Sequence, residues 1–226
     1  MKDLLERILS YLPVYIPDLV RIVSGPKRFV AERNRGDEGE LIKALTFFGV
    51  SLAIFFILQA DVTVRGRGFV TDVGIHGTLN LLSVVIFSAI IRIAWKIVGG
   101  KAGYRGFLIT SLYYVGVLLL GIGIATIFFT GILRLFYPDA YAWFIQYLVA
   151  PSLDGALNLD PRLYGGFVVA GTGFLILAVL TSAWGLIGWG AYRELNQLPR
   201  SRSYAALFLT LVFFSPVAVG LFIAGW

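Results

Sequence analysis

Five long stretches of apolar residues divide this chain, and charged or glycine-rich segments separate them. They cover about residues 42–60, 79–98, 107–133, 164–191 and 204–224. A helix needs roughly 20 apolar residues to cross the hydrocarbon core of a bilayer. The pattern therefore predicts an all-α fold, a polytopic bundle of five transmembrane helices that forms one membrane domain over residues 41–226.

Residues 1–40 follow a different pattern, in which leucine and isoleucine recur at helical spacing between charged positions. The apolar members are Leu4, Leu5, Ile8, Leu9 and Leu12. This spacing predicts an amphipathic helix that lies in the membrane interface on the cytoplasmic side. We expect Pro13 and Pro17 to end it, and Pro26 to begin a short second helix. No basic start, unbroken apolar core and cleavage site occur together here, so we expect no cleavable signal peptide.

Two connections are long enough to hold structure of their own. Residues 61–78 alternate in character and contain glycines, which predicts a loop or short hairpin with His76 as an ordinary loop residue. Residues 134–163 form the longest connection, and Pro138 begins a short helix in it. Its aromatic residues predict that this helix lies at the membrane–water interface; they are Tyr141, Trp143, Phe144 and Tyr147.

Composition supports a membrane protein over a soluble one. Hydrophobic residues make up 58% of the 226 residues and charged residues 14%, whereas soluble domains have about 45–50% and 25%. A soluble core of this size could not bury so much apolar surface, so the excess must face lipid. The chain has no cysteine, which excludes disulfides, thiolate nucleophiles and cysteine metal sites.

The distribution of lysine and arginine predicts the orientation of the bundle. With a cytoplasmic N-terminus, 15 of the 19 Lys and Arg residues lie inside and 4 outside. Cytoplasmic loops carry such an excess of basic residues. Five crossings then place the C-terminus outside.

Residues that could perform chemistry are few and scattered. No Asp or Glu lies well inside a predicted span, which argues against an ion-coupled pump. His76 is the single histidine, and neither a zinc motif nor a Walker nucleotide motif occurs. The acids assigned to outside loops could bind a cation or a partner, or they could simply be solvated; they are Asp61, Asp72, Asp139, Asp154 and Asp160. We therefore expect no catalytic residue, metal or cofactor, and a protein that is not an enzyme.

Glycines are frequent within the third and fourth spans. Small residues allow close helix approach in lipid, where association depends on packing. We assign a helix-packing role, either within the bundle or against another subunit, to Gly116, Gly121, Gly123, Gly171, Gly173, Gly185 and Gly188.

Basic residues gather in the segments assigned to the cytoplasm and leave few acids among them. This face could dock anionic lipid or an acidic protein, or it could serve only to set topology. Nucleic acid is not an expected partner, because the charge is explained by the membrane. The residues are Lys27, Arg28, Arg33, Arg35, Arg92, Lys96, Lys101, Arg105, Arg193, Arg200 and Arg202.

Three motifs in this order resemble the Yip1 family of membrane proteins, in particular its bacterial members. They are Gly25-Pro26-Lys27-Arg28-Phe29 before the first span, Gly99-Gly100-Lys101-Ala102-Gly103-Tyr104 before the third, and Ala191-Tyr192-Arg193-Glu194-Leu195 with residues 201–205 before the fifth. The resemblance implies five helices, a cytoplasmic N-terminus and the bacterial cytoplasmic membrane. Eukaryotic members are linked to Rab GTPases, but their Asp-Leu-Tyr-Gly-Pro motif is absent here as a continuous stretch.

Two functions follow as expectations. The first is a non-enzymatic scaffold or adaptor that binds lipid, another membrane subunit or a second copy of itself through the basic face. The alternative is a transporter or channel subunit energised by a separate partner. Its path would be lined by hydroxyl groups, with the candidates Thr110, Ser111, Thr126, Thr130, Thr172, Thr181 and Ser182.

Overall fold

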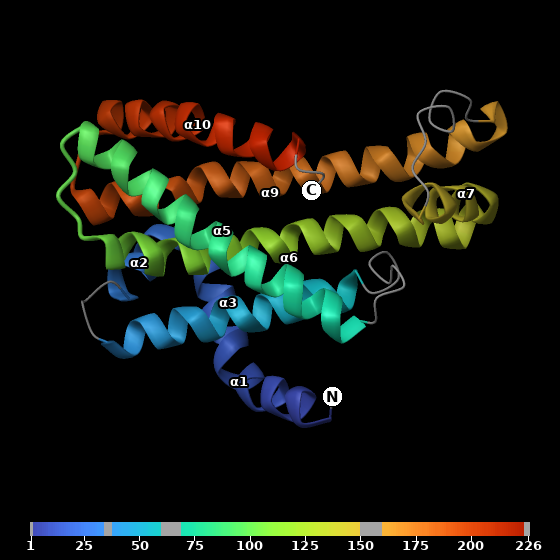
Figure 1. The fold of residues 1–226 in the computed structure, drawn as a ribbon, viewed down its shortest axis with the longest axis horizontal. Coiled ribbons are helices and arrows are strands. Elements are labelled where there is room, and N and C mark those ends of the chain that lie inside the picture. Colours follow the sequence, from blue (N-terminus) through green and yellow to red (C-terminus); the bar gives the residue numbers. More distant parts are fainter. Residues whose placement is uncertain (1, 34–37, 60–68, 150–159, 224–226) are drawn as a thin grey trace. The chain divides into compact units, whose positions relative to one another are not determined.

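The computed structural model describes residues 2–33, 38–59, 69–149 and 160–223, and every element in these ranges is helical (Figure 1). This confirms the predicted all-α class. The elements are α1 (Lys2–Ser24), α2 (Pro26–Arg33), α3 (Glu38–Leu58), α5 (Phe69–Ile97), α6 (Tyr104–Phe136), α7 (Pro138–Val149), the 3-10 helix η1 (Pro161–Leu163), α9 (Tyr164–Asn196) and α10 (Arg200–Ile223).

Four helical segments among the described residues are long and apolar enough to cross a membrane. They are Gly39–Leu58, Gly74–Ile97, Tyr104–Phe136 and Pro161–Asn196. These segments coincide with the first four predicted spans and indicate a membrane protein. The fifth predicted span falls almost entirely within α10, which is not one of the four.

The prediction that Pro13 and Pro17 end the first helix is wrong, because α1 is continuous through both. A proline inside a helix removes one backbone hydrogen bond and crowds the preceding turn. Here the two prolines are one turn apart, and both side chains are exposed. The lost hydrogen bonds therefore fall on one outer strip of the helix. The second helix begins at Pro26, as predicted.

The loop predicted over residues 61–78 is wrong for its second half. Residues 69–78 form the beginning of α5, so His76 and Asp72 are helical, while residues 61–68, including Asp61, lie outside the described ranges. Glycine is a poor helix former in isolation. A Cβ added to Gly77 would lie in ordinary contact with Leu52 and Phe56 of α3. Packing between helices thus overrides the local signal.

Two other predicted connections are also shorter than expected. The helix predicted to begin at Pro138 is confirmed as α7, with Asp139 in its first turn, and Asp160 caps η1, whereas Asp154 is not described. These acids therefore do not all lie in open loops. The last predicted loop, 192–203, is also mostly helical, because α9 extends to Asn196 and α10 begins at Arg200.

The chain divides into two compact units. The first comprises Met1–Val50, Thr78–Val117 and Trp184–Trp226, and the second comprises Ser51–Gly77 and Leu118–Ala183. Each has an apolar core of its own. In the first unit it is centred on Trp95, Trp189 and Tyr192, and in the second on Leu133, Ala140 and Ala170.

Candidate functional site

Seven of the predicted docking residues lie in or near two short turns of the first unit, one between α5 and α6 and one between α9 and α10. Both turns lie at the same end of the first unit, at the left in Figure 1. Five of the predicted docking residues in or near these turns have exposed side chains. These are Arg92, Lys96, Lys101, Arg200 and Arg202.

The side chain of Asn196 fastens the two turns together. Its Oδ1 accepts a hydrogen bond from the backbone N–H of Ala102 at 3.3 Å, and its Nδ2 donates to the carbonyl of Tyr192 at 2.8 Å. Nη1 of Arg202 donates to the carbonyl of Val98 at 3.4 Å. Asn196 is buried, so its two hydrogen bonds satisfy an amide group that water does not reach.

The α5–α6 turn requires glycine at two positions. Gly99 has a φ of 97°, a conformation that side chains with a Cβ rarely adopt. A Cβ on Gly100 would lie 2.5 Å from Oδ1 of Asn196 and 2.9 Å from the carbonyl oxygen of Trp95. The glycine-rich sequence therefore serves close packing of the two turns.

Aromatic residues of α5, α6 and α9 pack against one another next to the turns. The rings of Trp95 and Trp189 stack with centroids 5.9 Å apart, and those of Phe107 and Tyr192 stack at 5.8 Å. Nε1 of Trp189 donates to the carbonyl of Ser203 at 3.2 Å, which joins α9 to the first turn of α10. The exposed cations therefore belong to turns and helix ends that aromatic packing and hydrogen bonds hold in place.

The cations of these turns are mostly not neutralised by acids. Within the part of the chain that the structure describes, Arg92, Lys96, Lys101 and Arg200 form no ion pair. Arg193 differs, since it is half-buried and bonds to Glu194 at 2.6 Å. The four residues Arg92, Lys96, Lys101 and Arg200 are called the turn cations below.

The predicted docking residues of the N-terminal segment have other surroundings. Arg33 bonds to Asp18 of α1 at 2.6 Å and to Glu40 of α3 at 3.4 Å, and Lys43 bonds to Glu40 at 2.6 Å. Arg28 bonds to Glu32 at 2.9 Å. Lys27 lies with its side chain against Gly190, while Arg35 lies outside the described residues and Arg105 is half-buried.

Arg33 is the centre of a partly buried charge cluster that joins α1, α2 and α3. Burial lowers the pKa of Arg33, but the hydrogen bond from Arg33 to Asp18 and the charges of Asp18 and Glu40 outweigh it, so the pKa is raised above its usual value. Its guanidinium also lies 5.4 Å from the ring centroid of Phe29. Arg33 therefore stays protonated at any physiological pH.

Aromatic side chains next to this charge cluster connect it to the helices of the bundle. Phe29 meets Tyr113 edge to face with centroids 4.9 Å apart, Phe47 lies 5.0 Å from Tyr113, and Tyr15 lies 4.9 Å from Phe47. The cluster holds the N-terminal helices against α3 and α6. Sequence reasoning missed Asp18, Glu40 and Asn196, because only the fold brings each of them to its partner.

The glycines assigned to packing differ in their surroundings. A Cβ would lie 2.6 Å from Thr181 at Gly121, 3.3 Å from Leu58 and Phe55 at Gly123, and 2.7 Å from Tyr114 at Gly188, and it would meet Phe128 at Gly173. At Gly171 no atom lies within 4 Å. Gly116 and Gly185 are buried, and the carbonyl of Gly185 accepts a hydrogen bond from Tyr114 at 2.5 Å.

The hydroxyl groups considered for a transport path mostly bond within the bundle. Thr110, Thr130 and Thr172 donate to carbonyls four residues earlier in their own helices. Ser111 bonds to Tyr192 at 2.8 Å, and Thr126 accepts from Gln59 at 3.3 Å. Thr181 packs against Gly121, while Ser182 is exposed.

No metal site is formed by three or more histidine or acidic residues within the described ranges.

Comparison with known proteins identifies no relative of this chain. No family model matches the chain, and no curated protein and no solved structure is significantly similar to it. The resemblance to the Yip1 family thus stays a prediction from its three motifs.

Proposed function

We propose that this chain is a non-enzymatic membrane scaffold of Yip1 type that binds anionic lipid through the turn cations. The observation that carries the proposal is that Arg92, Lys96, Lys101 and Arg200 are exposed and, among the described residues, form no ion pair. Exposed cations without internal partners are available to phosphate groups, whereas the Arg33 side chain is mostly buried and already bonds to Asp18 and Glu40.

The apolar neighbours of the turn cations support lipid over an acidic protein. On α5, Arg92 and Lys96 alternate with Ile93 and Ile97, whose side chains are 53% and 59% exposed. On α10, Tyr204 is 68% exposed one turn after Arg200. Cations beside exposed apolar groups match the boundary between headgroups and acyl chains, where long basic side chains extend toward the headgroups.

The proposal includes five crossings, with α10 as the fifth, a cytoplasmic N-terminus and an outside C-terminus. The lysine and arginine distribution supports this orientation. It places both turns in the cytoplasmic leaflet of the bacterial membrane. That leaflet carries anionic lipid and attracts basic segments by about 1 kcal/mol per cation.

Lipid binding by detergent-purified protein tests this function. A variant with Arg92, Lys96, Lys101 and Arg200 all changed to glutamine is titrated with phosphatidylglycerol and with phosphatidylcholine, and bound lipid is read by native mass spectrometry. We expect phosphatidylglycerol affinity to fall by roughly tenfold or more, since several cations are removed. Arg162→Gln, at an exposed residue of η1, is the control.

Equal binding of both lipids by the unmodified protein, or unchanged phosphatidylglycerol affinity in the fourfold variant, would refute the proposal.

A further inference from the structure

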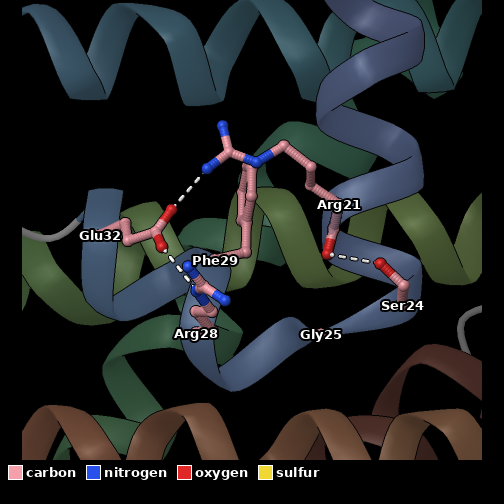
Figure 2. Close-up of a pocket in the computed structure, with 6 residues that line it drawn as sticks. All are labelled: Arg21, Ser24, Gly25, Arg28, Phe29 and Glu32. Atoms are coloured by element: carbon pink, nitrogen blue, oxygen red, sulfur yellow. Dashed lines mark hydrogen bonds and ion pairs between the residues drawn. The ribbon is translucent and has the colours of Figure 1, made fainter.

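A pocket with a volume of about 440 Å³ opens where α1 meets α2 (Figure 2). Its lining combines two cations, one acid, a hydroxyl and an aromatic ring. The residues are Arg21, Ser24, Gly25, Arg28, Phe29 and Glu32. All belong to the first unit and lie close in sequence.

Two guanidinium groups in this pocket share one carboxylate. Nη2 of Arg21 lies 2.5 Å from Oε2 of Glu32, and Nε of Arg28 lies 2.9 Å from Oε1 of the same residue (Figure 2). The three side chains carry a net charge of +1. The arginine side chains are 55% and 88% exposed, whereas that of Glu32 is 32% exposed. The positive charge is therefore the accessible part of the pocket.

The pocket also places the cation of Arg21 next to an aromatic ring. The guanidinium of Arg21 lies 6.0 Å from the ring centroid of Phe29, which is itself buried. Gly25 leaves the backbone between the helices uncovered, since a Cβ there would meet only the carbonyl oxygen of Arg21, at 3.8 Å. A guanidinium fork held in this way matches the oxygens of a phosphate group.

We propose that this pocket binds the phosphomonoester headgroup of a membrane lipid of the phosphatidic acid class. A phosphomonoester carries close to two negative charges at neutral pH. Two arginines can neutralise both charges, and Glu32 is the internal anion that the phosphate displaces. A phosphodiester lipid offers one charge and is the weaker match.

The face of α1 next to the pocket indicates a lipid rather than a soluble phosphate. Ile16, Val20 and Val23 follow one another at helical spacing, and their side chains are 54%, 61% and 46% exposed. Ser24 lines the pocket one turn after Val20, and its Oγ donates to the carbonyl of Val20 at 2.7 Å. An apolar stripe that ends at a cationic pocket matches a molecule with an acyl chain and an anionic headgroup.

The test compares the full chain with Arg28→Gln, Arg21→Gln and Glu32→Gln in detergent, with native mass spectrometry of added phosphatidic acid and phosphatidylglycerol. We expect either arginine variant to bind phosphatidic acid about tenfold more weakly, since each removes a charge-assisted contact. Glu32→Gln removes the competing anion, so it binds phosphatidic acid more tightly. If Glu32 served only to hold the pocket together, Glu32→Gln would instead bind phosphatidic acid more weakly.

The fourfold turn variant separates this site from the proposed function. If the pocket is the site, the fourfold variant still binds phosphatidic acid more tightly than phosphatidylglycerol, although its affinity for phosphatidylglycerol has fallen. A second experiment adds inorganic phosphate as a competitor of phosphatidic acid. If phosphate displaces the lipid at concentrations equal to those of the lipid, the pocket binds a soluble anion and the lipid assignment is overturned. Unchanged binding in both arginine variants, or weaker binding in Glu32→Gln, would overturn the site itself.

Discussion

Replacing Arg33 with glutamine removes a group that bonds to acids of both α1 and α3. The variant loses the contact of 2.6 Å to Asp18 and that of 3.4 Å to Glu40, and it loses the cation over the ring of Phe29. Glu40 keeps Lys43 as a partner. Asp18, whose side chain is 12% exposed, is left with a buried negative charge.

The size of the effect follows from this burial. Breaking a fully buried ion pair costs about 3–5 kcal/mol, and a hydrogen bond to a charged group contributes about 1.5–3 kcal/mol. The side chain of Arg33 is 20% exposed, so water moderates the loss. We expect Arg33→Gln to lower the free energy of unfolding by about 2–3 kcal/mol.

Equilibrium unfolding in mixed detergent and SDS micelles, followed by tryptophan fluorescence, measures this change. Arg28→Gln is the matched control, because its ion pair with Glu32 is exposed and is expected to contribute less than about 0.5 kcal/mol. In an Asp18→Asn background the Arg33 substitution should cost about 1–2 kcal/mol less, since the two residues interact directly. Equal losses for Arg33→Gln and Arg28→Gln, or full additivity with Asp18→Asn, would refute the reasoning.

Three further predictions concern the turns, the packing and the topology. Asn196→Ala leaves the N–H of Ala102 without its acceptor and should cost about 1–2 kcal/mol in the same unfolding assay, with a loss of anionic lipid affinity; unchanged stability would contradict the role of this side chain. Gly188→Ala places a Cβ 2.7 Å from Tyr114 and should lower the free energy of unfolding by about 1–3 kcal/mol. Gly171→Ala places its Cβ in open space and should be neutral or stabilising. Similar effects of the two substitutions would contradict the packing role of Gly188. A reporter active only in the cytoplasm, fused after Trp226, should stay silent, and an active fusion would exclude five crossings with the N-terminus inside.

The sequence alone predicts the helices and their membrane character, because both depend on local pattern. A span shows itself as a run of about 20 apolar residues, and four such segments occur where the pattern places them. Pro26 and Pro138 begin helices for a reason that is also local, since proline fits the first helical turn. The start of α5 at Phe69 and the passage of α1 through Pro13 and Pro17 do not follow from this pattern.

Only the tertiary structure decides which cations are available to a ligand. The sequence presents Arg33 and Lys96 as equivalent members of one basic face, but the fold brings Asp18 and Glu40 to Arg33 and, among the described residues, no acid to Lys96. Likewise, Asn196 reaches Ala102 across 94 positions of the chain. Helical periodicity specifies the face on which a residue lies, whereas its charge partner depends on which helices pack together.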